Sequence, residues 1–234
     1  MRVLALDTTT RAGSVAVLED GRVLIERSGD GSRTQTERLP GELLDALTAV
    51  SLGTRDIDLF AVATGPGSFT GLRTGIATIQ GLALVHRRPV AALSALRALA
   101  EAAAAGQPAG TRVGAWMDGH RREVFSALYT VVEPAGPLGA AVLAEVEAHR
   151  VGLPAETVTR WASLGQPAVL CGDGATLYAA LVPEPVRVLT APPLASFLGR
   201  LAPADAPVPP AGVRPLYVRR PDVELTREAA RARA

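Results

Sequence analysis

The 234-residue chain contains no lysine, because all 24 of its basic residues are arginine. Without lysine there is no Walker A phosphate loop, no Schiff base to a carbonyl or pyridoxal cofactor and no kinase-type lysine on nucleotide phosphates. Cysteine is almost as scarce, since Cys171 is the only one. A single thiol forms no internal disulfide and no zinc knuckle, so we expect a reducing compartment and no redox role.

Histidine is also scarce, and the three histidines, His86, His120 and His149, stand 34 and 29 residues apart. That spacing gives no paired-histidine metal motif of the HExxH kind. No GxSxG sequence presents a serine nucleophile either. These absences leave few candidates for a metal ligand or for an acid, base or nucleophile.

Long apolar runs are missing as well, because no uncharged apolar stretch reaches 18 residues. The chain begins MRVLALDTTT, which places Asp7 where a signal peptide would carry its apolar run. We therefore expect a cytoplasmic protein without a membrane segment. The formal net charge of +1 gives no general attraction to nucleic acid, so RNA contact would need a local patch or a partner.

The distribution of proline divides the chain into two parts. Residues 1–106 contain three prolines and residues 107–234 contain the other fifteen. An alanine-rich stretch ends between them in Gly106, Pro108 and Gly110, which are residues that stop helices or form loops. We therefore predict an amino-terminal domain over residues 1–106 and a proline-rich carboxy-terminal domain over residues 107–234.

The first part alternates strands with helices, which predicts an α/β layer with a mixed sheet. Strands are expected at Val3–Asp7, Ser14–Leu18, Val23–Arg27, Leu59–Ala63 and Val90–Leu93, and helices over Leu39–Val50, Phe69–Val85 and from Ser94 to about Ala105. The second part has weaker patterns. It predicts strands at Arg112–Met117, Glu123–Thr130 and Ala168–Cys171, helices around Thr157–Ser163 and Ala175–Leu181, and an irregular proline-rich end.

Three acidic turns follow predicted strands. Asp7, Thr8, Thr9 and Thr10 come directly after the first strand, where a carboxylate and three hydroxyls can face a phosphate or a metal. The sequences Asp118-Gly119 and Gly172-Asp173-Gly174 come after later strands. The alternative is that these are tight turns whose side chains bind their own backbone. The residues alone leave both interpretations open.

The most distinctive segment is GPGSFTGLR at residues 65–73. Its glycine turn leads into a helix and is typical of an anion-binding loop, with Ser68 or Thr70 as the cap. Within the helix, Gly71, Gly75 and Thr78 form a stripe of small side chains that predicts the close approach of another helix. That helix is either the Leu39–Val50 helix of the same chain or the equivalent helix of another subunit, and the pattern does not decide between them.

Several motifs together resemble the bacterial TsaB (YeaZ) family. They are DTTT at 7–10, GPGSFTGLRTG at 65–75, WMDGHRREVF at 116–125, GDG at 172–174 and RPLYVRR at 214–220. The match runs in order through nearly the whole chain. The GPGSFTGLR segment is specific to this family and its catalytic relative TsaD, whereas DTTT and GDG mean little alone.

The resemblance implies an actin-like ATPase (ASKHA, ribonuclease H-like) fold of two related α/β domains. It implies a non-catalytic dimerisation and scaffold subunit for tRNA threonylcarbamoyladenosine (t6A) synthesis, with no catalytic residue, no metal and no cofactor of its own. Such a subunit binds and activates TsaD, which transfers the threonylcarbamoyl group to the tRNA adenosine next to the anticodon, and it works with the ATPase TsaE. It would meet tRNA only within the complex and would form a homodimer when alone.

The resemblance also implies which residues contact the partner, namely those of the first two helices. They are Leu39, Leu43, Leu47, Phe69, Gly71, Leu72, Gly75, Ile76, Thr78 and Ile79. The DTTT segment becomes a vestigial phosphate loop. Residues 35–40, QTERLP, depart from relatives that begin this helix with a histidine and two leucines before the proline. The arginines 214, 219, 220, 227, 231 and 233 form either an RNA contact or a solvated tail.

The alternative function is a small-molecule kinase or ATPase of the same fold group. It would use Asp7, Asp118 and Asp173 around Mg-ATP. The irregular phosphate loops and the missing Gly-Gly pair of an adenine pocket count against this alternative. A glycoprotease activity is excluded because neither metal ligands nor a nucleophile motif is present.

Overall fold

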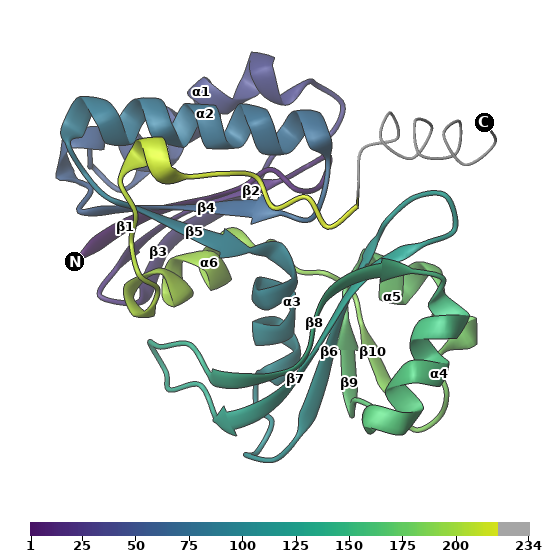
Figure 1. The fold of residues 1–234 in the computed structure, drawn as a ribbon. Helices are drawn as coiled ribbons and strands as arrows, with labels where there is room; N and C mark the ends of the chain where they lie inside the picture. The colour runs from purple at the N-terminus through teal and green to yellow at the C-terminus, as the bar shows by residue number, and fades with distance from the viewer. Residues whose placement is uncertain (220–234) are drawn as a thin grey trace.

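The computed structural model describes residues 1–219. The first sheet begins with three short strands that form an antiparallel meander (Figure 1). β1 (Arg2–Asp7), β2 (Ser14–Glu19) and β3 (Arg22–Ser28) pair antiparallel. The turn between β2 and β3 is made by Asp20 and Gly21, both at positive φ, as a tight hairpin requires.

Two parallel strands complete this sheet. β4 (Leu59–Gly65) pairs with β1 and β5 (Val90–Ser94) pairs with β4, so the strand order is β3-β2-β1-β4-β5. The crossover helices α1 (Gln35–Ala49) and α2 (Phe69–His86) lie together on one face of the sheet (Figure 1).

The second sheet repeats the connectivity of the first. β6 (Arg112–Asp118), β7 (Val124–Glu133) and β8 (Val142–Gly152) form an antiparallel meander, and β9 (Val169–Cys171) and β10 (Arg187–Leu189) add in parallel. The order β10-β9-β6-β7-β8 mirrors that of the first sheet. The predicted fold class, two related α/β domains with mixed sheets flanked by helices, is confirmed.

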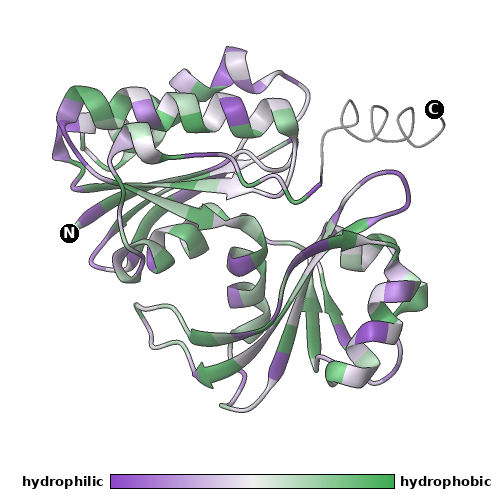
Figure 2. Ribbon diagram, viewed as in Figure 1, coloured by the Kyte–Doolittle hydropathy of each residue, from purple (hydrophilic) through white to green (hydrophobic). Residues whose placement is uncertain are grey.

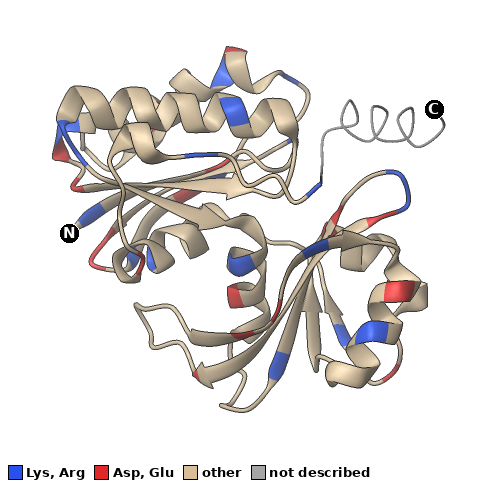
Figure 3. Cartoon of the chain, viewed as in Figure 1, with Lys and Arg blue, Asp and Glu red and all other residues tan. Residues whose placement is uncertain are grey.

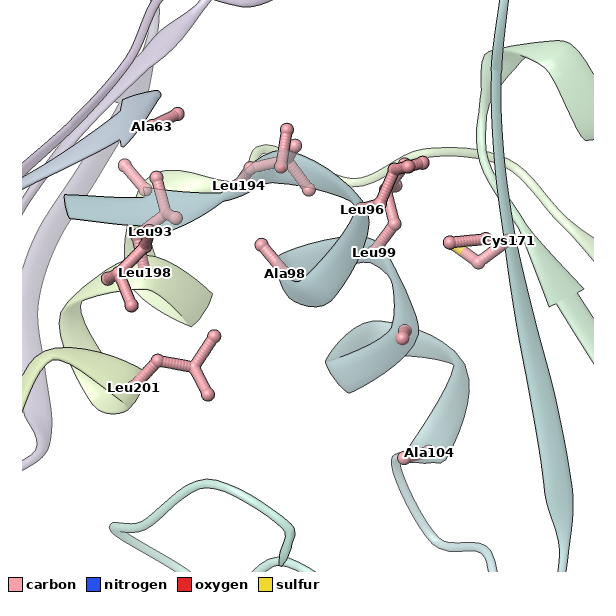
Figure 4. Close-up of a cluster of buried hydrophobic side chains, with 14 of the residues drawn as sticks. Ala63, Leu93, Leu96, Ala98, Leu99, Ala104, Cys171, Leu194, Leu198 and Leu201 are labelled. Atoms are coloured by element: carbon pink, nitrogen blue, oxygen red, sulfur yellow. The ribbon is translucent and has the colours of Figure 1, made fainter. Parts of the chain in front are cut away.

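The helices that follow the last strand of each sheet cross to the other sheet. α3 (Ala95–Ala104) follows β5 but packs on β6, β7 and β9, whereas α6 (Ala195–Leu201) packs on β1 and β2. The two helices contact each other between the sheets, where leucines from both meet (Figure 4). α4 (Pro154–Leu164) and α5 (Asp173–Leu177) lie on the second sheet's side away from α3. Four 3₁₀ turns span Thr54–Asp56, Ala179–Leu181, Ala202–Ala204 and Pro210–Gly212.

The alternation of side chains along each strand separates three cores. Val3 and Ala5 of β1 point to the central layer of α3 and α6, whereas Leu4 and Leu6 point to α1 and α2. The third core lies under α4 and contains Trp116 and Trp161, whose ring centroids are 5.8 Å apart. Figure 2 shows hydrophobic residues along both sheets and the helices between them.

All the strands and helices predicted for the first part are present, although α1 begins four residues earlier, at Gln35. In the second part β8, β10 and α6 were not predicted. The β8 sequence VLAEVEAHRVG is rich in alanine and glutamate, which do not favour strands, so its pairing with β7 decides its conformation. α6 stands between prolines, which made this region look irregular.

The division predicted at residue 106 falls in the loop between α3 and β6. It stays a prediction, because α3 and α6 each pack across it. Within residues 1–219, none of the helices has the length and apolar character needed to cross a membrane.

Candidate functional site

A cleft of about 780 Å³ opens between the two sheets, where strands of both end. Its walls are the loops that follow β1, β4 and β6, together with the start of α5. A smaller hollow of about 180 Å³ adjoins it and shares Thr10, Met117 and Asp173 with it. The carboxyl ends of parallel strands are where α/β proteins usually bind ligands, so this cleft is the first candidate site.

The structure brings the three acidic turns to this cleft. Asp7 lines the smaller hollow, Asp118 lines the cleft and Asp173 lines both. Asp7 is buried, and one oxygen of its carboxylate, Oδ1, accepts hydrogen bonds from Thr9 N at 2.9 Å and Thr9 Oγ1 at 2.6 Å. Burial raises the pKa of Asp7, the Thr9 bonds act in the opposite direction, and the charge of Asp173 adds to the rise.

The other two carboxylates are also bound by backbone amides of their own or a neighbouring turn. Asp173 Oδ1 accepts hydrogen bonds from Asp118 N at 2.9 Å and Gly174 N at 2.8 Å. Asp118 Oδ1 accepts a hydrogen bond from His120 N at 2.9 Å. The tight-turn interpretation therefore describes all three segments. Among the described residues, no three histidine, cysteine or acidic side chains come close enough together to hold a metal ion.

The glycine turn before α2 is locked to the loop after β1. Ser68 caps the helix, because its Oγ accepts a hydrogen bond from Gly71 N at 3.2 Å, and Ser68 N donates to Thr9 O at 2.8 Å. Gly67 has a φ of 153°, and a Cβ there would lie 2.6 Å from Thr9 O. The turn therefore packs tightly against its own chain at this point.

The two helix glycines pack against the same loop. A Cβ on Gly75 would lie 2.2 Å from Thr8 Oγ1, and one on Gly71 would lie 2.3 Å from Thr8 O. Gln35, the first residue of α1, reinforces the contact by donating hydrogen bonds to Thr8 O at 3.2 Å and Thr10 O at 3.0 Å. The close approach predicted for these glycines is thus made by the loop after β1, with Gln35 beside it. A helix of another subunit is not needed to explain them.

Most of the predicted partner contacts are inside the chain's own core. The sequence pattern selected the apolar face of each helix, and this face packs on the first sheet. Phe69 is 54% exposed and Thr78 is half-buried. The other eight are buried and do not reach the surface: Leu39, Leu43, Leu47, Gly71, Leu72, Gly75, Ile76 and Ile79.

Beyond Phe69, Thr70 and Arg73 at its amino end, the exposed residues of α2 are small or apolar. Ala77 and Gly81 are exposed, and nothing lies within 4 Å of a Cβ added to Gly81. Leu84 and Val85 are 59% and 76% exposed. Arg73 is the only Arg, Lys, Asp or Glu of α2, so the helix is almost free of charge (Figure 3).

An aromatic cluster stands at the amino end of α2, on the rim of the cleft. Phe69 and Tyr217 stack with ring centroids 5.5 Å apart, and the Arg73 guanidinium lies 4.0 Å from the Phe69 centroid. Arg73 Nε donates a hydrogen bond to Tyr217 Oη at 3.1 Å. Both rings are about half exposed. Sequence reasoning missed this cluster because Tyr217 is more than 140 residues from Arg73, although both lie in motifs of the resemblance.

The described members of the arginine cluster are bound within the chain. Arg214 donates to Ala211 O and Val213 O, and Arg219 pairs with Glu123. The remaining four, at positions 220, 227, 231 and 233, lie outside the described residues.

Comparison with known proteins identifies relatives of this chain. Residues 29–154 match the family model TsaD, tRNA N6-adenosine threonylcarbamoyltransferase. The tRNA threonylcarbamoyladenosine biosynthesis protein TsaB of Escherichia coli is 41% identical over 129 residues, which are 55% of each chain. The match therefore spans about half the length of this relative.

Two further relatives match over nearly their full length. An uncharacterised protein of Mycobacterium tuberculosis is 32% identical over 225 residues, covering 95% of this chain and 93% of that one. The structure of YeaZ from Pseudomonas aeruginosa is 31% identical, with a TM-score of 0.75 over 92% of this chain and 99% of that one.

Proposed function

Because the chain belongs to the TsaB (YeaZ) family, we propose that it acts in tRNA t6A biosynthesis as a non-catalytic subunit that binds and activates a TsaD-type transferase. A TsaE-type ATPase completes the assembly, and tRNA is met only within it. The work is done in the cytoplasm, where the tRNA substrate is found.

The observation that carries this proposal is the exposed face of α2. A helix surface of Ala77, Gly81, Leu84 and Val85 is unusually apolar and smooth for a water-exposed surface. Its small residues let a second helix approach closely, and because Arg73 is its one charged residue, the desolvation penalty of binding is small. Leu44 of α1, which is 57% exposed, adds to the apolar surface of the same helical layer.

The aromatic cluster extends this surface at the amino end of α2. Aromatic and arginine side chains supply much of the binding energy in protein interfaces. Phe69 and Tyr217 are held in place by stacking and by Arg73, so little side-chain entropy is lost when a partner covers them. We propose that α2 and this cluster bind TsaD, and that the same face forms a homodimer when the protein is alone.

The hydrogen bonding of the acidic side chains at the cleft supports a non-catalytic role. Asp7, Asp118 and Asp173 each accept hydrogen bonds from backbone amides of their own or a neighbouring turn. One oxygen of each carboxylate, Oδ1, is therefore used for local structure. A transferase active site would instead present such groups to substrate.

The proposal is tested by placing a charge on the α2 face. Ala77→Arg inserts a long cation into the smooth surface and is expected to weaken capture of TsaD by at least tenfold and to abolish stimulation of threonylcarbamoyl transfer. Ala162→Arg is the matched control, because Ala162 is also an exposed alanine in a helix, but on α4 of the other domain. Binding is measured by pull-down and calorimetry, and activity by t6A formation on tRNA.

The two variants give a clear decision. Equal binding of TsaD by Ala77→Arg and Ala162→Arg would reject the α2 face as the interface. In the absence of TsaD, the Ala77→Arg variant should sediment as a monomer at concentrations where the parent chain is a dimer. A parent chain that is itself monomeric at all concentrations would reject the homodimer.

The convergence of Asp7, Asp118 and Asp173 on one cleft favours a second candidate, a small-molecule kinase or ATPase. Calorimetry with Mg-ATP on the isolated protein separates the two functions. Micromolar binding accompanied by hydrolysis would support the kinase. We expect no turnover, since the carboxylates are held by their turns.

A further inference from the structure

A second pocket, of about 520 Å³, lies between the domains and shares no lining residue with the cleft. Its base is formed where α3 and α6 meet, with Arg97 from α3 and Arg200 from α6. The turn between β2 and β3 and the loop between β7 and β8 form its walls. These two walls touch, because a Cβ on Gly21 would lie 1.9 Å from Leu138 O.

Arg200 has an unused guanidinium in this pocket. Among residues 1–219 it has no hydrogen-bond or ion-pair partner, and its Nε is shielded from solvent. Glu26 and Glu101 attract it only at longer range. A guanidinium carries five N–H donors in a planar fork, and a buried donor without an acceptor is unfavourable. Arg200 Nε is therefore a buried donor without an acceptor in the pocket wall.

Arg97 is held rigidly beside it. Its terminal nitrogens donate to Leu143 O at 3.1 Å and Ala141 O at 2.8 Å, and its guanidinium lies 5.6 Å from the Tyr129 ring centroid. Its Nε is buried and has no acceptor among the described residues. Glu101 accepts a hydrogen bond from Ala141 N, which fixes the same loop. Arg97 also forms an ion pair with the buried Glu101, with 3.6 Å between Nη2 and Oε2, so it orders the pocket in advance and adds no free positive charge.

The remaining lining is mainly apolar. It includes the loop between β7 and β8 and the end of α6, and its larger side chains are Leu138, Val142, Leu143, Leu201 and Pro203. Leu138 and Val142 are about half exposed, although both are large apolar residues. The one acidic side chain of the lining, Asp20, already pairs with the terminal amino group.

We propose that this pocket binds an organic carboxylate with a short apolar body. The carboxylate accepts bidentate hydrogen bonds from the Arg200 guanidinium, and the apolar body lies against the loop at Leu138 and Val142. A guanidinium matches a carboxylate in shape and charge, and apolar walls strengthen the attraction by excluding water. The pocket is separate from α2, so the inference does not depend on TsaD binding.

The test uses the full chain with hexanoate as the probe, in calorimetry and in chemical-shift mapping by NMR. Saturable binding is expected, with shifts at residues 138–143. Arg200→Gln should weaken it by about tenfold or more, the usual effect of losing a charge-assisted hydrogen bond. Arg187→Gln, at an exposed arginine of β10, is the matched control and should bind as the parent does.

Further probes and variants make the outcome decisive. Hexanol and hexylamine should not bind, since neither offers a carboxylate to Arg200. Leu138→Asp changes an exposed side chain, places a negative charge at the apolar wall and should also weaken hexanoate. The Leu138→Asp variant therefore tests hexanoate binding independently if Arg200→Gln disturbs folding. No saturable binding of hexanoate, equal binding by Arg200→Gln and the parent, or loss of binding in Arg219→Gln at the other cleft would overturn the proposal.

Discussion

Gly75 and Gly81 both belong to α2, but Gly75 is packed against Thr8 and Gly81 faces open space. We therefore predict that substitution by alanine changes stability in opposite directions at the two positions. Gly75→Ala places a Cβ 2.2 Å from Thr8 Oγ1 in a buried contact, so we expect a loss of about 1–3 kcal/mol from overpacking. Gly81→Ala places a Cβ in open space and should gain up to about 1 kcal/mol from helix propensity. Urea unfolding measures both.

The clash at Gly75 has a specific rescue. Thr8→Ala removes the two nearest atoms that the new Cβ would meet, Oγ1 and Cγ2, and the Oγ1 hydroxyl is buried without a hydrogen-bond partner among the described residues. The double variant should recover most of the stability lost by Gly75→Ala. A strictly additive double variant would contradict the contact between these residues.

From the surroundings of Glu147 in β8, we predict that the free energy of unfolding falls in acid. It is buried and accepts hydrogen bonds from Trp161 Nε1 at 2.7 Å and from Arg160. Burial acts to raise the pKa of Glu147, but these bonds and the charges of Arg160 and Arg150 outweigh it and lower the pKa. A carboxyl with a lowered folded pKa contributes stability above its unfolded value near 4.5, and this contribution is lost as the pH falls through the folded pKa.

Glu147→Gln should therefore be less stable than the parent at neutral pH, and the difference should shrink in acid. Urea unfolding followed by tryptophan fluorescence at neutral pH and below pH 4.5 measures it. Glu156→Gln, at an exposed glutamate in the first turn of α4, should follow the parent at both pH values. A constant gap between Glu147→Gln and the parent would show that the ion pair does not carry the effect.

Sequence patterns predicted those elements whose residues favour one structure locally. The buried runs of β1 and β4 and the capped α3 were predicted because apolar residues, Ser94 and the loop residues all agree. β8 was missed because its alanines and glutamates do not favour a strand, and its conformation depends on antiparallel pairing with the preceding strand, β7.

The same limit explains the candidate site. Periodicity shows that a helix has an apolar face, but not whether that face meets the chain's own sheet or a partner. In α2 the sheet takes Leu72, Ile76 and Ile79, and the small residues beyond them form the exposed face. Contacts such as Gly75 with Thr8, or Phe69 with Tyr217, join segments far apart in the chain and have no local signal.

The turn between β6 and β7 holds three consecutive residues, His120, Arg121 and Arg122, at positive φ. The left-handed region costs a residue with a Cβ about 1–2 kcal/mol, and glycine avoids that cost. Arg122→Gly should therefore stabilise the protein by up to about 1 kcal/mol after the entropy of glycine in the unfolded chain is subtracted. Arg122→Ala keeps the Cβ and should give no gain. Equal stability of the two variants in urea unfolding would reject strain at this turn.

The exchange of α3 and α6 between the sheets ties the two halves together. The central core joins Ala5 and Ala16 of the first sheet to Val113 and Ala115 of the second through these helices. Alanine dominates this layer, and its small side chains let the helices lie close to both sheets. The abundance of alanine in the chain thus has a structural use. Because α3 and α6 each pack on the sheet of the other half, neither half contains the whole of its own core.

This arrangement predicts that the whole chain unfolds in one transition, in spite of its two sheets. Both tryptophans, Trp116 and Trp161, lie in the second half, so their fluorescence reports that half, whereas far-ultraviolet circular dichroism reports both. The two signals should give the same urea midpoint. The isolated fragment 1–106 should show no cooperative transition, because its first sheet lacks α6 and its α3 lacks the second sheet.

A substitution at Leu198 of α6 tests whether the unfolding of the two halves is coupled through the exchanged helices α3 and α6. It is fully buried, and α6 packs on β1 and β2 although it belongs to the second half of the chain. Leu198→Ala should cost about 2–5 kcal/mol, as for other buried leucines, and should lower both midpoints together. Independent domains would respond differently: the circular dichroism of the first sheet would shift while the tryptophan midpoint stayed in place. That result, or a cooperative transition of fragment 1–106, would establish the boundary at residue 106 as a division between two units that fold separately.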